Sequence, residues 1–159
     1  MQIPSDDIAA LPVVSSNPSA KLICGVLAFD FGEKRIGVAS GEHLLGIAHP
    51  LTTINAAANE ERFRIIAELI AEWRPGLLVV GLPLSVEGEE HALTLLAKKF
   101  SRRLDGRFGL PVVMVDERYT SVEASRTLKQ MGISGRKQKT MLDAVAAQHI
   151  LQSYFDALP

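Results

Sequence analysis

The sequence predicts a single α/β domain built on a mixed β-sheet with helices on both faces. Three apolar runs come first, joined by connections too short to contain a helix, which indicates three antiparallel strands. Helical patterns then alternate with two further apolar runs, which indicates parallel strands joined by helical crossovers. At 159 residues, with 47% hydrophobic residues, the chain has the length of one domain and can bury a substantial core.

The first two strands are expected to form a hairpin over residues 25–39. Its two apolar runs are joined by a charged turn that contains glycine, which suits a tight connection. Successive strand side chains point to opposite faces of a sheet. Asp30 therefore shares a face with the small residue Ala28, whereas Phe29 and Phe31 pack on the other face.

The next elements follow in alternation. A third strand is expected over residues 44–54, where Gly46 and Pro50 suit an edge or a bulge better than the middle of a sheet. Residues 59–73 repeat apolar side chains at helical spacing until a proline, which indicates an amphipathic helix. The apolar run over 77–82 is typical of a parallel strand that is buried on both faces.

The rest of the chain continues this pattern. A second helix is expected over residues 89–104 and a second buried strand over 112–115. A third helix is expected over 120–132 and a last one over 140–155. Between them, residues 132–139 contain glycines and three cations, and we expect a mobile basic loop there.

Residues 1–20 are expected to form a flexible tail, because prolines and serines interrupt them without sustained periodicity. Residues 21–159 then make up the folded domain. No apolar run is long enough to span a bilayer, and the N-terminus lacks the pattern of a signal peptide. We therefore expect a cytoplasmic protein with no membrane partner.

The formal net charge of −1 hides an uneven distribution of charge. Residues 101–159 carry nine Lys and Arg against six Asp and Glu. This mild excess permits a polyanionic partner without requiring one. The four histidines are scattered without the spacing of a zinc site, and the sequence contains no glycine-rich phosphate-binding motif.

Acidic residues interrupt the predicted apolar elements at three distant places. They are Asp30 in the first strand, Asp116 and Glu117 at the end of the last strand, and Asp143 on the apolar face of the last helix. Carboxylates that converge repel one another unless cations lie between them, and hard oxygen ligands select Mg²⁺ or Mn²⁺. Such a cluster suits phosphodiester hydrolysis. Taken singly, Asp30 could instead cap a turn, and Asp143 could belong to a capping arrangement with Thr140.

Cations accompany these acids and are candidates for phosphate contacts. Two lie in the turn after Asp30, and three lie in the basic loop that leads into the helix of Asp143. Another follows the Asp116 and Glu117 pair, where it could instead hold those carboxylates by a charge-assisted hydrogen bond. The candidate substrate-binding residues are Lys34, Arg35, Arg118, Arg136, Lys137 and Lys139.

Four stretches, in this order and spacing, resemble the motifs of the YqgF/RuvX family of pre-16S rRNA nucleases, formerly described as Holliday junction resolvases. They are residues 30–39, 79–83, 116–120 and 143–155, and the resemblance covers residues 22–156. It implies a ribonuclease H-like fold and an endonuclease site that depends on Mg²⁺ or Mn²⁺. It also implies a role in processing the 5′ end of the 16S rRNA precursor.

Carried over by position, the resemblance makes Asp30, Glu117 and Asp143 the catalytic acids and metal ligands. Asp116 is a further candidate ligand, and the choice between it and Glu117 stays open. One position departs from the family pattern. The family usually has Asp-Gly shortly after the Gly-Leu-Pro motif, whereas this chain has Glu87 before its glycine. The carboxylate is kept with a longer reach, so its role stays open.

Other functions remain to be weighed against a nuclease of structured RNA. Branched DNA is the alternative substrate, and a nucleic-acid-binding module without catalysis is a different class, against which the retained acids argue. An actin-like or sugar-kinase ATPase also has Asp-x-Gly after a first strand, but it needs two such lobes and 159 residues hold one. A monomer or a weak homodimer is expected.

Overall fold

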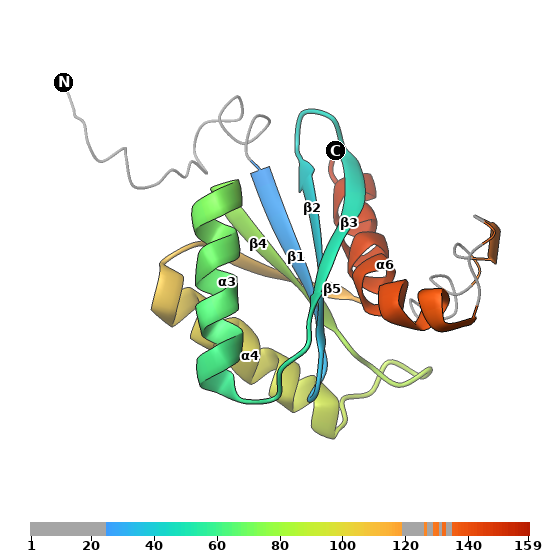
Figure 1. Cartoon of the computed structure of the whole chain (residues 1–159), viewed down its shortest axis with the longest axis horizontal. Helices are drawn as coiled ribbons and strands as arrows, with labels where there is room; N and C mark the ends of the chain where they lie inside the picture. The colour runs from blue at the N-terminus through green and yellow to red at the C-terminus, as the bar shows by residue number, and fades with distance from the viewer. Residues whose placement is uncertain (1–24, 119–125, 127–128, 131, 133–134) are drawn as a thin grey trace.

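The computed structural model describes residues 25–118, 126, 129, 130, 132 and 135–159. Within them the chain forms one five-stranded sheet with helices on both faces, which confirms the predicted class (Figure 1). In chain order the elements are β1 (Gly25–Phe31), β2 (Ile36–Glu42), β3 (Ile47–Ile54), α3 (Asn59–Trp73), β4 (Leu77–Leu82), α4 (Ala92–Phe108), β5 (Val112–Asp116) and α6 (Gly135–Asp156).

The strand order across the sheet is β3-β2-β1-β4-β5. The three N-terminal strands pair in antiparallel fashion, whereas β4 is parallel to both β1 and β5. Strands β1, β4 and β5 therefore end at the same edge of the sheet, which is where open α/β sheets place their sites. Strand β3 lies at the opposite side as an edge strand, and its pairing shifts register beside Pro50, as the sequence predicts.

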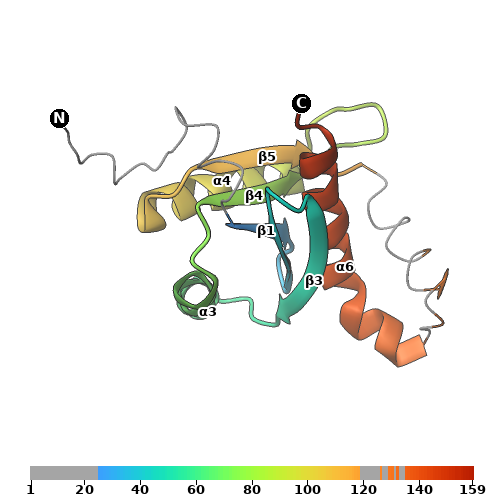
Figure 2. The same cartoon turned by 90° about the horizontal axis from the view of Figure 1, so that it is seen from above.

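The two faces of the sheet carry separate apolar cores, and Figure 2 shows the helices on either side. Helices α3 and α4 cover the face of Phe29. Helix α6 covers the face of Ala28, so Asp30 points toward α6. The core under α3 and α4 includes Leu27, Phe29, Val38, Phe63, Ile66, Leu78, Val80, Phe100 and Leu104. The core under α6 includes Val26, Ala28, Ala39, Val79, Ala147, Ile150, Leu151 and Phe155.

Helix α6 rests directly on the backbone of β2. A Cβ atom added at Gly37 would lie 1.9 Å from the carbonyl oxygen of Asp143. Only a residue without a side chain allows this approach. Because Gly37 pairs with Asp30 across β1 and β2, this contact brings the helix that carries Asp143 to the strand that carries Asp30.

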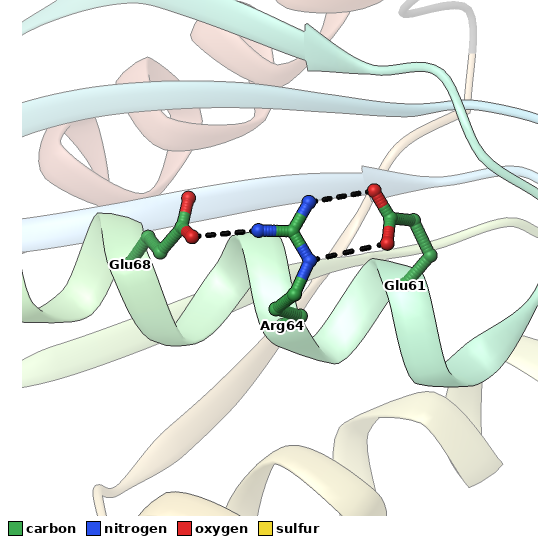
Figure 3. Close-up of polar contacts among 3 residues, drawn as sticks. All are labelled: Glu61, Arg64 and Glu68. Atoms are coloured by element: carbon green, nitrogen blue, oxygen red, sulfur yellow. Dashed lines mark hydrogen bonds and ion pairs between the residues drawn. The ribbon is translucent and has the colours of Figure 1, made fainter.

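The solvent-facing side of α3 is a compact network of charges (Figure 3). The Arg64 guanidinium donates hydrogen bonds to both carboxylate oxygens of Glu61, at 3.1 and 2.7 Å, and to Glu68 at 2.7 Å. Exposed pairs at this helical spacing contribute little to stability. Together the two glutamates accept hydrogen bonds from all three guanidinium nitrogens of Arg64.

Several element boundaries differ from those expected. Strand β3 begins at Ile47, because residues 43–46 turn and Gly46 takes a φ of +65°. Helix α4 begins at Ala92 instead of Glu89, whose backbone N–H donates to the Ser85 hydroxyl in a turn. Within the described residues, no helix is both long and apolar enough to cross a bilayer.

The expected basic loop over residues 132–139 is wrong in its second half. Helix α6 begins at Gly135, so Arg136, Lys137 and Lys139 belong to its first turns. Lys, Arg and Gln are strong helix formers, and they extend the helix back to the glycine. The expected tail over residues 1–20 and most of the helix expected over 120–132 lie outside the described residues.

Candidate active site

The site begins with two carboxyl groups that meet across the end of β4. Asp30 lies near the end of β1, and Glu117 directly follows β5, where its N–H donates to the Leu82 carbonyl at 3.2 Å. Between them, a Cβ added at Gly81 would lie 2.8 Å from Oε1 of Glu117 and 2.5 Å from Cδ1 of Ile150. The missing side chain at Gly81 therefore provides the space in which the Glu117 carboxyl lies.

The two groups share a hydrogen bond and have separated pKa values. Burial raises the pKa of Asp30 to about 6, the hydrogen bond from Glu117 acts in the opposite direction, and the charge of Asp143 raises it further. Burial raises the pKa of Glu117 to about 10, with further contributions from the charge of Asp30, their hydrogen bond and the charge of Asp116. At neutral pH the protonated Glu117 therefore donates to the Asp30 carboxylate.

The third acid, Asp143, reaches the same region from α6 but is held by a cation. The Arg35 Nε atom donates to its Oδ2 at 2.7 Å. Arg35 is half exposed in the turn between β1 and β2. Arg35, in the turn after Asp30, therefore neutralises Asp143, which is the one of the three acids that lies on a helix. The neighbouring cation Lys34 is exposed in the same turn.

Asp116 does not join the Asp30 and Glu117 pair. Its carboxylate accepts from the Arg118 backbone N–H at 3.0 Å and from the Arg118 guanidinium at 2.8 and 2.7 Å. These bonds lower the pKa of Asp116. Arg118 also donates to the Val86 carbonyl at 3.3 Å, so it ties the end of β5 to the loop before α4. In this structure Arg118 therefore holds the Asp116 carboxylate, which is the role that the sequence offered as an alternative to a phosphate contact.

The remaining predicted residues contribute less to this geometry. Glu87 is exposed in the loop before α4. The structure gives the backbone of Arg136, Lys137 and Lys139 but not their side-chain surroundings. Sequence reasoning missed the part played by Gly81, although a glycine inside a buried strand is a signal of close approach.

A divalent cation fits the donor chemistry of this site, although the described residues contain no group of three or more Asp, Glu, His or Cys side chains arranged to hold one. Asp30 and Glu117 are hard oxygen donors that already share a proton, and a cation could take its place. Asp143 is the third candidate ligand: its charge raises the pKa of Asp30, and its Oδ2 accepts from Arg35. That the three carboxylates form one metal-binding cluster stays a prediction.

The five-stranded mixed sheet with helices on both faces has a ribonuclease H-like fold. Thermus thermophilus RuvC has a TM-score of 0.51 at 19% identity over 84% of this chain and 95% of RuvC. The fowlpox virus resolvase, solved with its Holliday junction substrate, has a TM-score of 0.55 at 10% identity over 84% of this chain and 97% of the resolvase. At these identities the likeness concerns the fold alone.

The chain belongs to the RuvX family, described as Holliday junction resolvases, whose model matches residues 25–157. A protein of Methylobacillus flagellatus named "Putative pre-16S rRNA nuclease" is 70% identical over 141 residues, 89% of this chain and 97% of the relative. A protein of the same name from Nitrosomonas eutropha is 56% identical over 149 residues, 94% of this chain and 95% of the relative.

Proposed function

We propose that this chain is a divalent-metal-dependent endonuclease that processes the 5′ end of the 16S rRNA precursor in the cytoplasm. Membership of the family supports hydrolysis of phosphodiester bonds. Relatives named for the 16S precursor match nearly their whole lengths, which supports RNA as the substrate.

The observation that carries the proposal is the partly buried Asp30 and Glu117 pair. Two carboxyl groups in contact and partly removed from solvent are costly unless a proton or a cation compensates them. Groups whose pKa values are pushed apart in this way cluster at functional sites. The pair lies where three strands end, and Asp143 is close enough to influence the pKa of Asp30.

The residues of the chain have distinct tasks in this proposal. Asp30 and Glu117 provide oxygen ligands from rigid strands, and Asp143 provides a third from α6. Arg35 and Lys34 lie in the adjoining turn, where they can bind a substrate phosphate. Arg118 fixes the loop before α4 beside the site. A bound Mg²⁺ or Mn²⁺ would polarise the scissile phosphate and activate water.

The decisive experiment compares wild type, Asp30→Asn and Asp105→Asn on a labelled 16S precursor fragment and on a four-way DNA junction. Asp105→Asn makes the same chemical change at an exposed position of α4. We expect wild type and Asp105→Asn to cleave the RNA when Mn²⁺ is present, and Asp30→Asn to be slower by about a hundredfold or more.

The same experiment separates the alternatives. Cleavage of the junction but not of the RNA would favour branched DNA, the substrate in the family's description. Binding without cleavage of either substrate, unchanged by Asp30→Asn, would favour a non-catalytic nucleic-acid-binding module.

A further inference from the structure

A cavity of about 260 Å³ lies at the same edge of the sheet as the carboxyl pair, but on the opposite face of β1. Phe31 lines it and directly follows Asp30, so strand alternation places these two side chains on opposite faces. Its other walls come from the turn after β1, the first turn of α3 and the middle turns of α4. Figure 1 shows these three segments together at one end of the molecule.

The cavity is lined by three cations and one acid. Arg62, Lys99 and Arg103 face it together with Glu33. Arg62 is only 2% exposed. It is fixed by hydrogen bonds to the carbonyls of Ala56 and Gly32, both at 2.5 Å. A positive charge is thus built into the wall of the cavity.

The other two cations are available to a ligand. Lys99 and Arg103 lie one helical turn apart on α4. Among the described residues, none of the ion pairs involves either of them. They differ in this from Arg64 on the neighbouring helix, whose guanidinium is occupied by two glutamates (Figure 3).

The size and walls of the cavity indicate what it can bind. Its volume is below the roughly 300–1,000 Å³ of pockets that enclose a whole small ligand. It suits one group of a larger molecule. Phe31 and Phe100 lie with ring centroids 5.0 Å apart and give it an apolar floor, which can contact a sugar while the cations bind an anion.

We propose that this cavity binds a backbone phosphate of the nucleic-acid strand that is cut at the carboxyl pair. The inference rests on the proposed nuclease function. The strand would pass around the end of β1, with one phosphate held by Lys99 and Arg103 and the scissile phosphate on the other face. The bound phosphate then fixes which linkage reaches Asp30.

The test measures binding of the labelled 16S precursor fragment without divalent cations, so that it does not depend on cleavage. Lys99→Gln and Arg103→Gln should each weaken binding about three- to tenfold and reduce the salt slope by about 0.7. Arg102→Gln is the matched control, because Arg102 is exposed on the same helix and does not line the cavity. Glu33→Gln should tighten binding, since it removes a carboxylate from the cavity wall.

A second arm locates the phosphate. The RNA is prepared with one neutral methylphosphonate at each successive linkage. One substitution, a few nucleotides from the cleavage position, should weaken binding to wild type but have little further effect on Lys99→Gln. Inorganic phosphate that competes with the RNA at millimolar concentration, with no position-dependent loss, would indicate a free-phosphate site and overturn the proposal.

The outcomes distinguish this inference from the proposed function. If wild type cleaves RNA but Lys99→Gln and Arg103→Gln bind like Arg102→Gln, the inference is wrong and the nuclease function stands. If these two variants lose binding while wild type cleaves neither RNA nor junction, the phosphate site stands and the function is wrong. Failure of wild type to bind either nucleic acid would overturn both.

Discussion

Replacing Gly37 by alanine tests how the close contact between α6 and β2 controls the position of Asp143 in the site. The new Cβ would lie 1.9 Å from the carbonyl oxygen of Asp143, 2.3 Å from its carbonyl carbon and 3.0 Å from the nitrogen of Ala144. Contacts of Cβ atoms below 3.0 Å essentially do not occur, so the helix must move by about 1 Å or more at this point. The obstacle is backbone, and no side-chain rotation can relieve it.

We expect Gly37→Ala to lower the free energy of unfolding by about 1–3 kcal/mol, which is the usual cost of overpacking. For a chain of this size each kcal/mol corresponds to roughly 2–4 °C in Tm. Because the helix that moves carries Asp143, cleavage should fall by about a hundredfold, as a 1 Å displacement of a reacting group commonly causes. Thermal unfolding and Mn²⁺-dependent cleavage of the 16S precursor fragment measure the two effects.

Gly106→Ala is the control for this experiment. Gly106 lies inside α4, and a Cβ added there would meet no atom within 4 Å. Alanine should therefore stabilise the helix by about 1 kcal/mol and leave cleavage unchanged. If Gly37→Ala has the Tm and the cleavage rate of wild type, α6 does not contact β2 as described. The argument that this contact positions Asp143 then fails.

Three further predictions concern the acids. Because the pKa of Asp30 is raised from 3.8 to about 6, ionisation of Asp30 should cost the metal-free protein up to about 3 kcal/mol of stability as the pH rises from 4 to 6, in addition to the loss due to the raised pKa of Glu117. Asp30→Asn should remove the cost of ionising Asp30, so in EDTA it should be more stable than wild type at pH 7.5 and equal to it at pH 4; a less stable variant at pH 7.5 would make Asp30 a structural residue. Arg35→Gln should change stability by less than about 1 kcal/mol yet tighten Mn²⁺ binding in calorimetry by freeing Asp143, whereas equal affinity would show that the ion pair does not compete with the metal. Gly81→Ala should displace the Glu117 carboxyl and slow cleavage, with retained activity as the contrary result.

The sequence was sufficient for the sheet and for the faces of its strands. Alternation in β1 assigned Phe29 to one core and Ala28 to the other, and both assignments are confirmed. Pro50 indicated an edge strand, which β3 is. These features follow from local patterns that do not depend on distant partners.

Contacts between distant segments could not be derived in the same way. Arg35 and Asp143 are separated by 108 positions in the chain, and neither residue's neighbours in sequence indicate the pairing. The start of α6 was also misjudged, because the cations of residues 136–139 suit both a basic loop and a helix. Helix propensity favoured the second structure.

The choice between Asp116 and Glu117 shows where a sequence argument could have gone further. Val115 packs in the core under α6, whereas Met114 packs in the core under α3 and α4. Continuing that alternation puts Glu117 on the α6 face, which is also the face of Asp30, and puts Asp116 on the other. The alternation of side chains along the strands is therefore enough to place Asp30 and Glu117 on the same face of the sheet. Asp143 is positioned differently, by how closely α6 approaches Gly37, so it is the acid whose distance from the pair a single substitution can change most easily.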